Sequence, residues 1–287
     1  MNTALQELVR EKLSLLSESG IESSAFELKM LLSHILNCEP FELYSYSGDL
    51  TPEEKNLFEA MIKQRLQHCP VDKIIGHKGF YKYEFVVSQD VLSPRADSEV
   101  LVENALKLLR PVKNAKILEF GIGSGCLLLS VLADKPDAYG IGVDISQQAL
   151  EIALKNAKNL GVSSRGKLFR SSWFDEEEIL NRAELTDLDL IISNPPYIAS
   201  AEIGSLAEEV KNFDPLIALD GGNDGLRDYR QISKIAFNLL KKDGYLIFEI
   251  GENQENDVIK IATDFGFKLY GVERDLNQIN RCIILKK

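Results

Sequence analysis

The stretch "ILEFGIGSG", residues 117–125, decides the fold. An apolar segment typical of a strand leads into Gly121, Gly123 and Gly125, and a helical pattern follows over 124–134. Glycines let the backbone approach a ligand closely, and the helix N-terminus offers free N–H groups. The spacing is G-x-G-x-G rather than G-x-G-x-x-G, and no G-K-[ST] follows. It therefore predicts a ligand-binding turn of a doubly wound sheet, without a dinucleotide fingerprint or a P-loop.

The next predicted strand, 139–144, ends in an acid. Asp144 lies about 20 residues beyond the glycine loop, where a carboxylate can accept hydrogen bonds from both hydroxyls of a ribose. The alternative interpretation is a simple acid at a helix N-terminus, ahead of the N-cap candidate Ser146. Strand, glycine loop, helix, strand and acid together favour a cofactor that contains a nucleoside.

The flanking segments alternate between strand and helix patterns. Further strands are predicted at 167–170, 188–193, 244–251 and 281–286, and further helices at 98–109 and 147–160. Strands that alternate with helices form a mostly parallel sheet with helices on both faces, the α/β class. The aromatic and β-branched segment 79–95 predicts a β-hairpin linker between N-terminal helices at 1–78 and a cofactor-binding catalytic domain at 96–287.

Two helix starts are predicted in the N-terminal region. Ser24 and Glu27 have the spacing of a capping box. Thr51, Pro52 and Glu54 combine an N-cap, a proline at the first helical position and an acid at the third. The simplest interpretation of the region is a packed helical bundle, and the functional one is a module that recognises a partner.

Composition limits the class of protein. The 287 residues are 45% hydrophobic and 27% charged, which is typical of a folded globular chain. The sequence contains no run of 18 apolar residues, so no membrane span is predicted. Because the N-terminus also lacks the pattern of a signal peptide, we expect a cytoplasmic protein. Four scattered cysteines and three histidines predict neither a disulfide framework nor a metal site. The net charge of −11 argues against stable binding to nucleic acid.

A second informative stretch is "SNPPYIAS", residues 193–200, which follows a predicted strand. Proline has no N–H and a fixed φ, so Pro195 and Pro196 make a rigid, donor-free turn. The nitrogen of a planar amide or an aniline-like amine is a weak nucleophile. Two hydrogen-bond acceptors in its plane could hold it in place, one on each of its N–H bonds. The Asn194 side-chain oxygen and the Pro195 carbonyl are the candidate acceptors, and Tyr197 can cover the flat face of the substrate. The simpler alternative is a turn that only ends a strand.

Three motifs, "EFGIGSG", "VD" and "NPPY", resemble those of the class I S-adenosylmethionine-dependent methyltransferases. The resemblance is to the members of that class that modify planar nitrogens. The chain resembles the HemK/PrmC family in "IIGHKGFYKYEFVVSQDVLSPRADSEVLVENAL", "SNPPYI", "ALDGGNDGLRDYR" and "LIFEIGENQ". That family methylates the side-chain amide of glutamine in peptide-chain release factors. The resemblance covers about residues 70–287 and implies a Rossmann-like domain with a mostly parallel seven-stranded sheet, beside a small N-terminal helical bundle.

The resemblance also implies the residues of the site. S-adenosyl-L-methionine would be the cofactor and S-adenosyl-L-homocysteine its product. The implied cofactor-binding residues are Glu119, Phe120, Gly121, Ile122, Gly123, Ser124, Gly125, Asp144, Ile145, Trp173 and Asn194. The implied substrate-binding residues are Asn194, Pro195, Pro196 and Tyr197, of which Asn194, Pro195 and Tyr197 would act in catalysis. For Trp173, expected in the adenine pocket, the alternative is ordinary core packing.

The implied partner is a class I release factor, whose Gly-Gly-Gln loop carries the target glutamine. The resemblance favours a monomer that binds neither nucleic acid stably nor a membrane. Two other functions fit the same residues. An adenine-N6 methyltransferase acting on DNA or RNA also needs a planar nitrogen held in place, but it requires base flipping on a duplex and a basic groove. A non-catalytic cofactor-sensing protein would keep the glycine loop without turnover.

Two positions depart from the family pattern. The family usually reads P-R-P-E-T-E before the first domain helix, and Ala96 replaces the second proline here. Its glycine loop usually begins with Asp-Leu-Gly, where this chain has Glu119 and Phe120. Glu119 keeps the acid that can face the cofactor's ammonium group, whereas Phe120 is bulkier than leucine. For "GGNDGLRDYR", residues 221–230, the sequence predicts only a turn that leads into a helix.

Overall fold

The computed structural model describes residues 3–287, so residues 1–2 of the predicted N-terminal region lie outside it. The chain forms two compact units. The helical unit runs to Gly76 and also contains Glu208–Phe213, and the sheet unit comprises His77–Ala207 and Asp214–Lys287. A short segment from late in the sequence is therefore part of the N-terminal helical unit.

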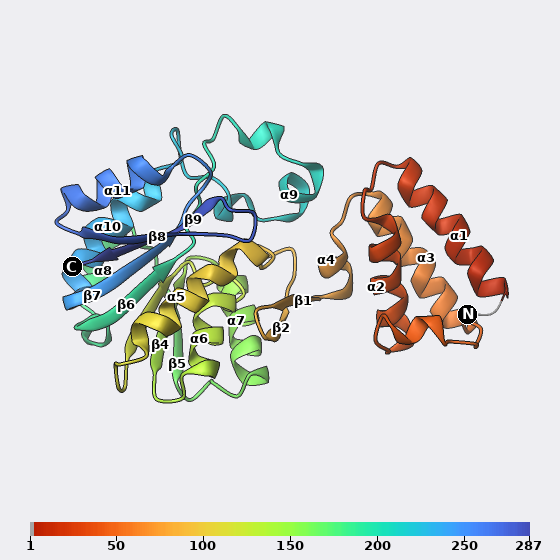
Figure 1. Ribbon diagram of the computed structural model, residues 1–287, viewed down its shortest axis with the longest axis horizontal. Helices are drawn as coiled ribbons and strands as arrows, with labels where there is room; N and C mark the ends of the chain where they lie inside the picture. The colour runs from red at the N-terminus through yellow and green to blue at the C-terminus, as the bar shows by residue number, and fades with distance from the viewer. Residues whose placement is uncertain (1–2) are drawn as a thin grey trace. The chain divides into compact units, whose positions relative to one another are not determined.

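The helical unit is a bundle of short helices (Figure 1). Its elements are α1 (Thr3–Glu18), α2 (Ser24–Leu36), η1 (Glu42–Tyr44), α3 (Pro52–Leu66), α4 (Val71–Ile75) and α9 (Glu208–Phe213). Leu16, Leu31 and Phe58 are completely buried in its core. The α9 segment is held by Arg65 and Lys73, whose side chains bond to the Glu209 carboxylate and the Phe213 carbonyl. Charged and backbone groups, rather than apolar packing alone, therefore attach α9.

The two predicted helix starts have different outcomes. The capping box at Thr51 is confirmed, since its hydroxyl accepts from the Glu54 N–H at 3.2 Å and the Glu54 carboxylate accepts from the Thr51 N–H at 2.8 Å. The box at Ser24 and Glu27 is wrong, because α2 begins at Ser24 itself without a side-chain cap. The Glu27 carboxylate is 2.5 Å from the guanidinium of the buried Arg65 instead. A buried cation is a stronger partner for that carboxylate than a helix terminus.

The sheet unit contains the predicted seven-stranded, mostly parallel sheet. Its strands are β3 (Lys116–Phe120), β4 (Tyr139–Asp144), β5 (Gly166–Arg170), β6 (Leu188–Ser193), β7 (Leu240–Glu249), β8 (Lys268–Arg274) and β9 (Asn280–Lys286). The strand order is β5-β4-β3-β6-β7-β9-β8, with β9 antiparallel to both of its neighbours. No strand was predicted at β8, an edge strand in which even the apolar side chains of Leu269 and Tyr270 are exposed.

Helices cover both faces of the sheet, as predicted (Figure 1). The helices of this unit, some of which lie in loops, are η2 (Ala96–Ser98), α5 (Glu99–Leu109), α6 (Cys126–Asp134), α7 (Gln147–Asn159), α8 (Glu176–Leu180), η3 (Ala183–Leu185), η4 (Ile203–Ser205), η5 (Leu216–Ala218), α10 (Arg227–Leu239) and α11 (Glu255–Asp264). One hydrophobic core lies against α5, α6 and α7, and a second lies against α8, α10 and α11. With one core on each face, the carboxyl edge of the sheet is left for loops.

The predicted hairpin is present as β1 (His77–Phe80) and β2 (Tyr83–Val86), an antiparallel pair. Phe80 and Phe85 are buried in the core beneath α5 and α6. The α7 side chain of Asn156 accepts from the Val86 N–H at 2.8 Å and donates to its carbonyl at 3.0 Å. The same amide donates to the Ser124 carbonyl at 2.8 Å, so one side chain joins the hairpin to the glycine loop.

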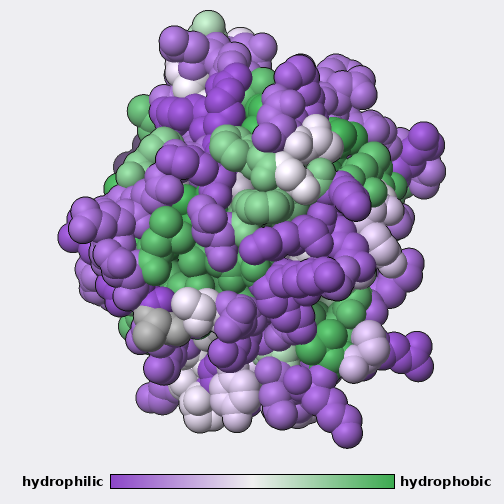
Figure 2. Space-filling view, turned by 90° about the vertical axis from the view of Figure 1, so that its left-hand side faces the viewer, coloured by the Kyte–Doolittle hydropathy of each residue, from purple (hydrophilic) through white to green (hydrophobic). Residues whose placement is uncertain are grey.

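Hydrophilic side chains predominate on the face of the molecule in Figure 2, between separate hydrophobic areas. None of the helices in residues 3–287 is long and apolar enough to cross a membrane.

Candidate active site

Three strands deliver their carboxyl ends to one edge of the sheet. Phe120, the last residue of β3, pairs with Val143 on one side and with Ser193 on the other. The Ser193 hydroxyl donates to the Phe120 carbonyl at 2.9 Å, which fastens two of these strand ends together. Asp144 is the last residue of β4, and Asn194 directly follows β6, so residues far apart in sequence emerge beside the glycine loop.

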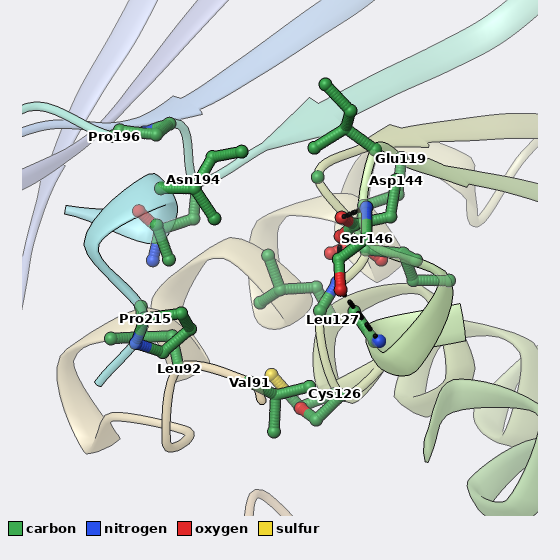
Figure 3. A pocket seen from close by; sticks show the side chains of 18 of the residues that line it. Val91, Leu92, Glu119, Cys126, Leu127, Asp144, Ser146, Asn194, Pro196 and Pro215 are labelled. Carbon is green, nitrogen blue, oxygen red and sulfur yellow. Dashed lines mark hydrogen bonds between the residues drawn. The ribbon is translucent and has the colours of Figure 1, made fainter. Parts of the chain in front are cut away.

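A cavity of about 210 Å³ opens at this edge. The predicted site residues that line it are Glu119, Gly121, Ile122, Gly123, Ser124, Asp144, Ile145, Trp173, Asn194 and Pro196. Four others do not: Phe120, Gly125, Pro195 and Tyr197. In Figure 3, Asp144 and Ser146 lie on one side of the cavity and Asn194 and Pro196 on the other. The cavity thus brings the predicted cofactor loop and the predicted substrate turn together.

The glycine loop has the backbone that only glycine adopts readily. Gly121, Gly123 and Gly125 have φ angles of 74°, 53° and 83°. A side chain at Gly123 would meet no atom within 4 Å, which leaves that position open towards the cavity. A side chain at Gly121 would lie 3.6 Å from the Trp173 ring. The loop therefore keeps its shape while leaving room for a ligand.

Asp144 is held in place by backbone N–H groups. One carboxylate oxygen accepts from Gly123 at 2.9 Å, and the other accepts from Ser146 at 2.9 Å. Burial raises the pKa of Asp144, and these hydrogen bonds oppose the shift. Each oxygen retains acceptor capacity, so the side chain can receive two further donors such as ribose hydroxyls.

Glu119 lies beneath the loop and is 2% exposed. It accepts from the Leu128 N–H of α6 at 2.9 Å, and burial raises its pKa well above the usual range. Within residues 3–287, no lysine or arginine forms an ion pair with Glu119 or with Asp144. Two buried acids at one cavity without a cationic partner fit a ligand that carries positive charge, as the ammonium and sulfonium of S-adenosylmethionine do.

Trp173 forms another wall of the cavity. Its indole N–H donates to Asp228 at 2.8 Å, and its ring meets Phe120 edge-to-face with centroids 6.4 Å apart. The Arg227 guanidinium is 3.0 Å from the Asp228 carboxylate. The bulkier Phe120 is thus buried beneath the tryptophan. The sequence did not predict Asp228 as a site residue, because an acid in the first turn of a helix is common and does not indicate a binding site. Its segment does resemble the family.

Asn194 lies next to a buried acid. Burial raises the pKa of Glu249 to about 7, and hydrogen bonds from Ser98 and Asn194 oppose the shift. The Ser98 hydroxyl is 2.5 Å from a Glu249 carboxylate oxygen. If the Asn194 side-chain nitrogen donates to that carboxylate, the side-chain oxygen points away from it. The oxygen then remains available to accept from a substrate N–H.

Tyr197 packs against the core on the α10 side of the sheet rather than lining the cavity. Burial raises the pKa of its phenol to about 12, so it stays neutral at physiological pH. Pro195 is also buried. The roles of the Tyr197 ring and the Pro195 carbonyl towards a substrate therefore stay predictions.

Other walls of the cavity were not singled out from the sequence. They come from Asp90–Arg95, Ser98, Cys126, Leu127, Ser146, Ala149, Ser172, Phe174, Pro215, Ile217, Ala218, Arg227 and Asp228. Arg95 pairs with Asp214 at 2.8 Å, which joins two of these segments, and Ala96 beside it is exposed. In the sequence, only the resemblance of some of these segments to the family pointed to them. Among residues 3–287, no group of histidine, cysteine, aspartate or glutamate could hold a metal ion.

Two protein families match the chain in adjacent parts. Residues 7–76 match the family described as PrmC N-terminal domain. Residues 84–210 match the family described as methyltransferase small domain. A solved structure from Streptococcus mutans, titled "A putative sam-dependent methyltransferase", has a TM-score of 0.51 at 11% identity, covering 71% of this chain and 53% of that one. This similarity shows the fold alone, and it agrees with the predicted Rossmann-like class.

Curated relatives match most of the chain. The release factor glutamine methyltransferase of Rhodospirillum rubrum is 38% identical over 273 residues, which cover 95% of this chain and 82% of the relative. That of Agrobacterium fabrum is 36% identical over 280 residues, 95% of this chain and 93% of the relative. With a matching N-terminal family, a matching methyltransferase domain and relatives covered over 82% and 93% of their length, this chain belongs to the family of release factor glutamine methyltransferases.

Proposed function

We propose that this chain transfers a methyl group to the side-chain amide nitrogen of the glutamine in the Gly-Gly-Gln loop of class I peptide-chain release factors. Support comes from the relatives, which carry the name release factor glutamine methyltransferase. The observation that carries the proposal is the convergence of Glu119, Asp144 and Asn194 on one cavity. Buried acids on one side suit a cationic methyl donor, and an oriented acceptor on the other suits an amide.

S-adenosyl-L-methionine supplies the methyl group and leaves as S-adenosyl-L-homocysteine. We assign its ammonium group to Glu119, its ribose hydroxyls to Asp144 and its adenine to the pocket beside Trp173 and Ile145. The loop from Gly121 to Gly125 holds the methionine part. The family resemblance implies these assignments, and the residues that line the cavity and the open space at Gly123 support them.

The Asn194 side-chain oxygen and the Pro195 carbonyl accept the two N–H bonds of the substrate amide. Its nitrogen forms a bond to the methyl carbon as the carbon–sulfur bond breaks, and one amide proton leaves to solvent. An in-line displacement depends mainly on positioning. Pro195 and Pro196 hold the acceptors still, because their φ angles are fixed before the substrate arrives. Neither acceptor acts as a strong base.

A protein-borne glutamine needs contacts beyond its amide. We assign the predicted N-terminal domain, residues 1–78, to recognition of the release factor, with the linker at 79–95 and the catalytic domain at 96–287. The match of residues 7–76 to the PrmC N-terminal domain supports this assignment. Release factors act where ribosomes translate, so the proposal places the protein in the cytoplasm, as a monomer without stable binding to nucleic acid.

The test uses S-adenosyl-L-methionine with a labelled methyl group. The full chain is incubated with a release factor and, in parallel, with the same factor in which the loop glutamine is changed to alanine. We expect label only in the unchanged factor, and mass spectrometry should place one methyl group on that glutamine. Equal labelling of both factors would overturn the proposal.

The same assay separates the two alternatives. Label in duplex or single-stranded DNA would favour the adenine-N6 methyltransferase, which the curated relatives do not support. Binding of S-adenosyl-L-homocysteine by calorimetry without turnover on any substrate would favour a non-catalytic cofactor sensor.

A further inference from the structure

The side chain of Gln254 connects three segments behind the Asn194–Tyr197 turn. Its amide nitrogen donates to the Tyr197 carbonyl at 2.9 Å and lies 3.4 Å from the Gly225 carbonyl. Its amide oxygen accepts from the Gly251 N–H at 3.0 Å. Carbonyls only accept and an N–H only donates, so these partners allow one orientation of the amide.

The Tyr197 backbone is also closed in by a glycine-rich turn. A side chain at Gly221 would lie 2.7 Å from the Pro196 carbonyl oxygen. A side chain at Gly225 would collide with the Tyr197 carbonyl oxygen. The Gly221 N–H donates to the Ile198 carbonyl at 2.9 Å. The segment that had no assigned chemistry therefore packs backbone to backbone against the two residues that follow Pro195.

Gln254 itself does not line the cavity, so it can act on substrate only through these contacts. Glu252 and Glu255 lie close to it in the sequence, and the Tyr229 hydroxyl lies 3.5 Å from the Gln254 amide oxygen. The same hydroxyl donates to the Glu249 carbonyl at 2.8 Å, which ties this support to the strand whose acid faces Asn194.

We propose that Gln254 is a positioning residue that, together with the turn Gly221–Gly225, fixes the course of the backbone from Pro195 to Ile198. The amide nitrogen of Gln254 holds the Tyr197 carbonyl, and this restrains the backbone two residues beyond the Pro195 carbonyl. This inference rests on the proposed function for its effect on turnover. Gln254 and the turn Gly221–Gly225 lie outside the cavity. Removing their contacts would loosen the Asn194–Tyr197 turn without changing the cofactor loop.

The decisive variant is Gln254→Glu. Glutamate keeps the length of the side chain and an acceptor for the Gly251 N–H, but its carboxylate cannot donate to the Tyr197 carbonyl. We expect kcat on the release factor to fall about 100-fold, the scale of a small misplacement at a reacting centre. The affinity for S-adenosyl-L-homocysteine should stay within about twofold, since no contact of the cofactor loop changes.

Acid should partly rescue the Gln254→Glu variant. When its introduced carboxyl group is protonated, the side chain regains one O–H donor for the Tyr197 carbonyl while its other oxygen still accepts from Gly251. The ratio of variant to unchanged kcat should therefore rise as the pH is lowered. The titratable side chains around this turn are common to both proteins: Tyr197, Asp224, Asp228, Tyr229, Glu249, Glu252 and Glu255. Taking the ratio at each pH therefore isolates the effect of the introduced carboxyl group.

Asn253→Asp is the matched control. It makes the same change from amide to carboxylate in the same turn, on an exposed side chain, and should leave kcat within about twofold. Equal kcat for Gln254→Glu, Gln254→Ala and the unchanged chain, with cofactor binding retained, would overturn the inference.

Hydrogen exchange gives a readout that does not depend on the substrate. The amides of Ile198 and Gly221 should exchange about tenfold faster in Gln254→Glu than in Asn253→Asp. If Gln254→Glu does not bind S-adenosyl-L-homocysteine, Gln254→Ala, which adds no charge, replaces it in this measurement. Unchanged exchange at both amides would also overturn the inference. Failure of the unchanged chain to label any release factor would instead overturn the proposed function.

Discussion

Two glycine-rich turns lie at the carboxyl edge of the sheet, and they use glycine for opposite purposes. At Gly123 a side chain would meet no atom within 4 Å. At Gly221 and Gly225 it would run into the backbone of Pro196 and Tyr197. The first turn needs glycine to keep space open for a ligand. The second needs it to let two backbones touch, so a glycine-rich segment is not by itself a ligand site.

The groups that support the two turns also differ. Behind the first are Glu119 and Asp144, buried acids that accept from backbone N–H groups and have no cationic partner among the described residues. Behind the second is Gln254, a neutral amide that donates to the Tyr197 carbonyl. Charge suits the side that we assign to a cationic cofactor, and a neutral clamp suits the side that we assign to an amide substrate.

The largest expected effect separates the two sides directly. Asn194→Ala removes one oriented acceptor, and we expect turnover to fall by about 10²–10³ or more while S-adenosyl-L-homocysteine binding is retained. Single-turnover kinetics and calorimetry measure the two quantities. Asn238→Ala, on an exposed side chain of α10, is the control. Near-normal turnover in Asn194→Ala would contradict the role assigned to this residue.

Gly225→Ala tests the contact between backbones. Its φ of 70° strains any residue with a side chain, and the added carbon would meet the Tyr197 carbonyl. We expect the free energy of unfolding to fall by about 2–4 kcal/mol in urea titrations. Gly204→Ala, where the added carbon meets nothing within 4 Å, should change it by less than about 0.5 kcal/mol. Equal stability of the two variants would show that the second turn does not need glycine.

Glu249→Gln tests the buried acid beside the second turn. Its pKa of about 7 in the fold compares with an ordinary value of 4.5, so between these values the folded chain holds a proton that the unfolded chain has released. The free energy of unfolding must therefore fall as pH rises through this window, by up to about 3 kcal/mol. The substitution should remove that part of the pH dependence.

Urea titrations at about pH 5 and about pH 8 measure this effect. Glu252→Gln, an exposed acid in the following turn, should leave the pH dependence unchanged. If the free energy of unfolding falls equally with rising pH in Glu249→Gln and in the unchanged chain, groups other than Glu249 cause the effect.

Gly123→Ala should have the smallest effect on the fold. Space is free, so only the positive φ of 53° strains alanine, and we expect a loss of about 1–2 kcal/mol in the free energy of unfolding. The affinity for S-adenosyl-L-homocysteine should fall by more than the loss of stability explains, about tenfold or more, because the added carbon points into the space assigned to the ligand. Unchanged affinity in calorimetry would place the cofactor elsewhere.

The sequence predicted the features that depend on local patterns. Apolar periodicity located most strands, three glycines marked the cofactor loop, and the N-cap at Ser146 is confirmed by its bond from the Ala149 N–H. It could not predict that Glu27 pairs with Arg65, 38 residues away, because a capping box and a long-range ion pair compete for the same carboxylate. Nor did it predict β8, an edge strand whose apolar residues Leu269 and Tyr270 face solvent rather than the core.

By itself the sequence determined the α/β class, the open glycine loop, the acid at the end of β4 and the rigid turn at Asn194, because each depends on residues within one or two neighbouring elements. Only the tertiary structure decided that Tyr197 packs against the core, that burial raises the pKa of Glu249 to about 7 and that Gln254 donates to the Tyr197 carbonyl. These properties depend on burial and on partners about 20 to 150 residues away, and no spacing along the chain records such contacts.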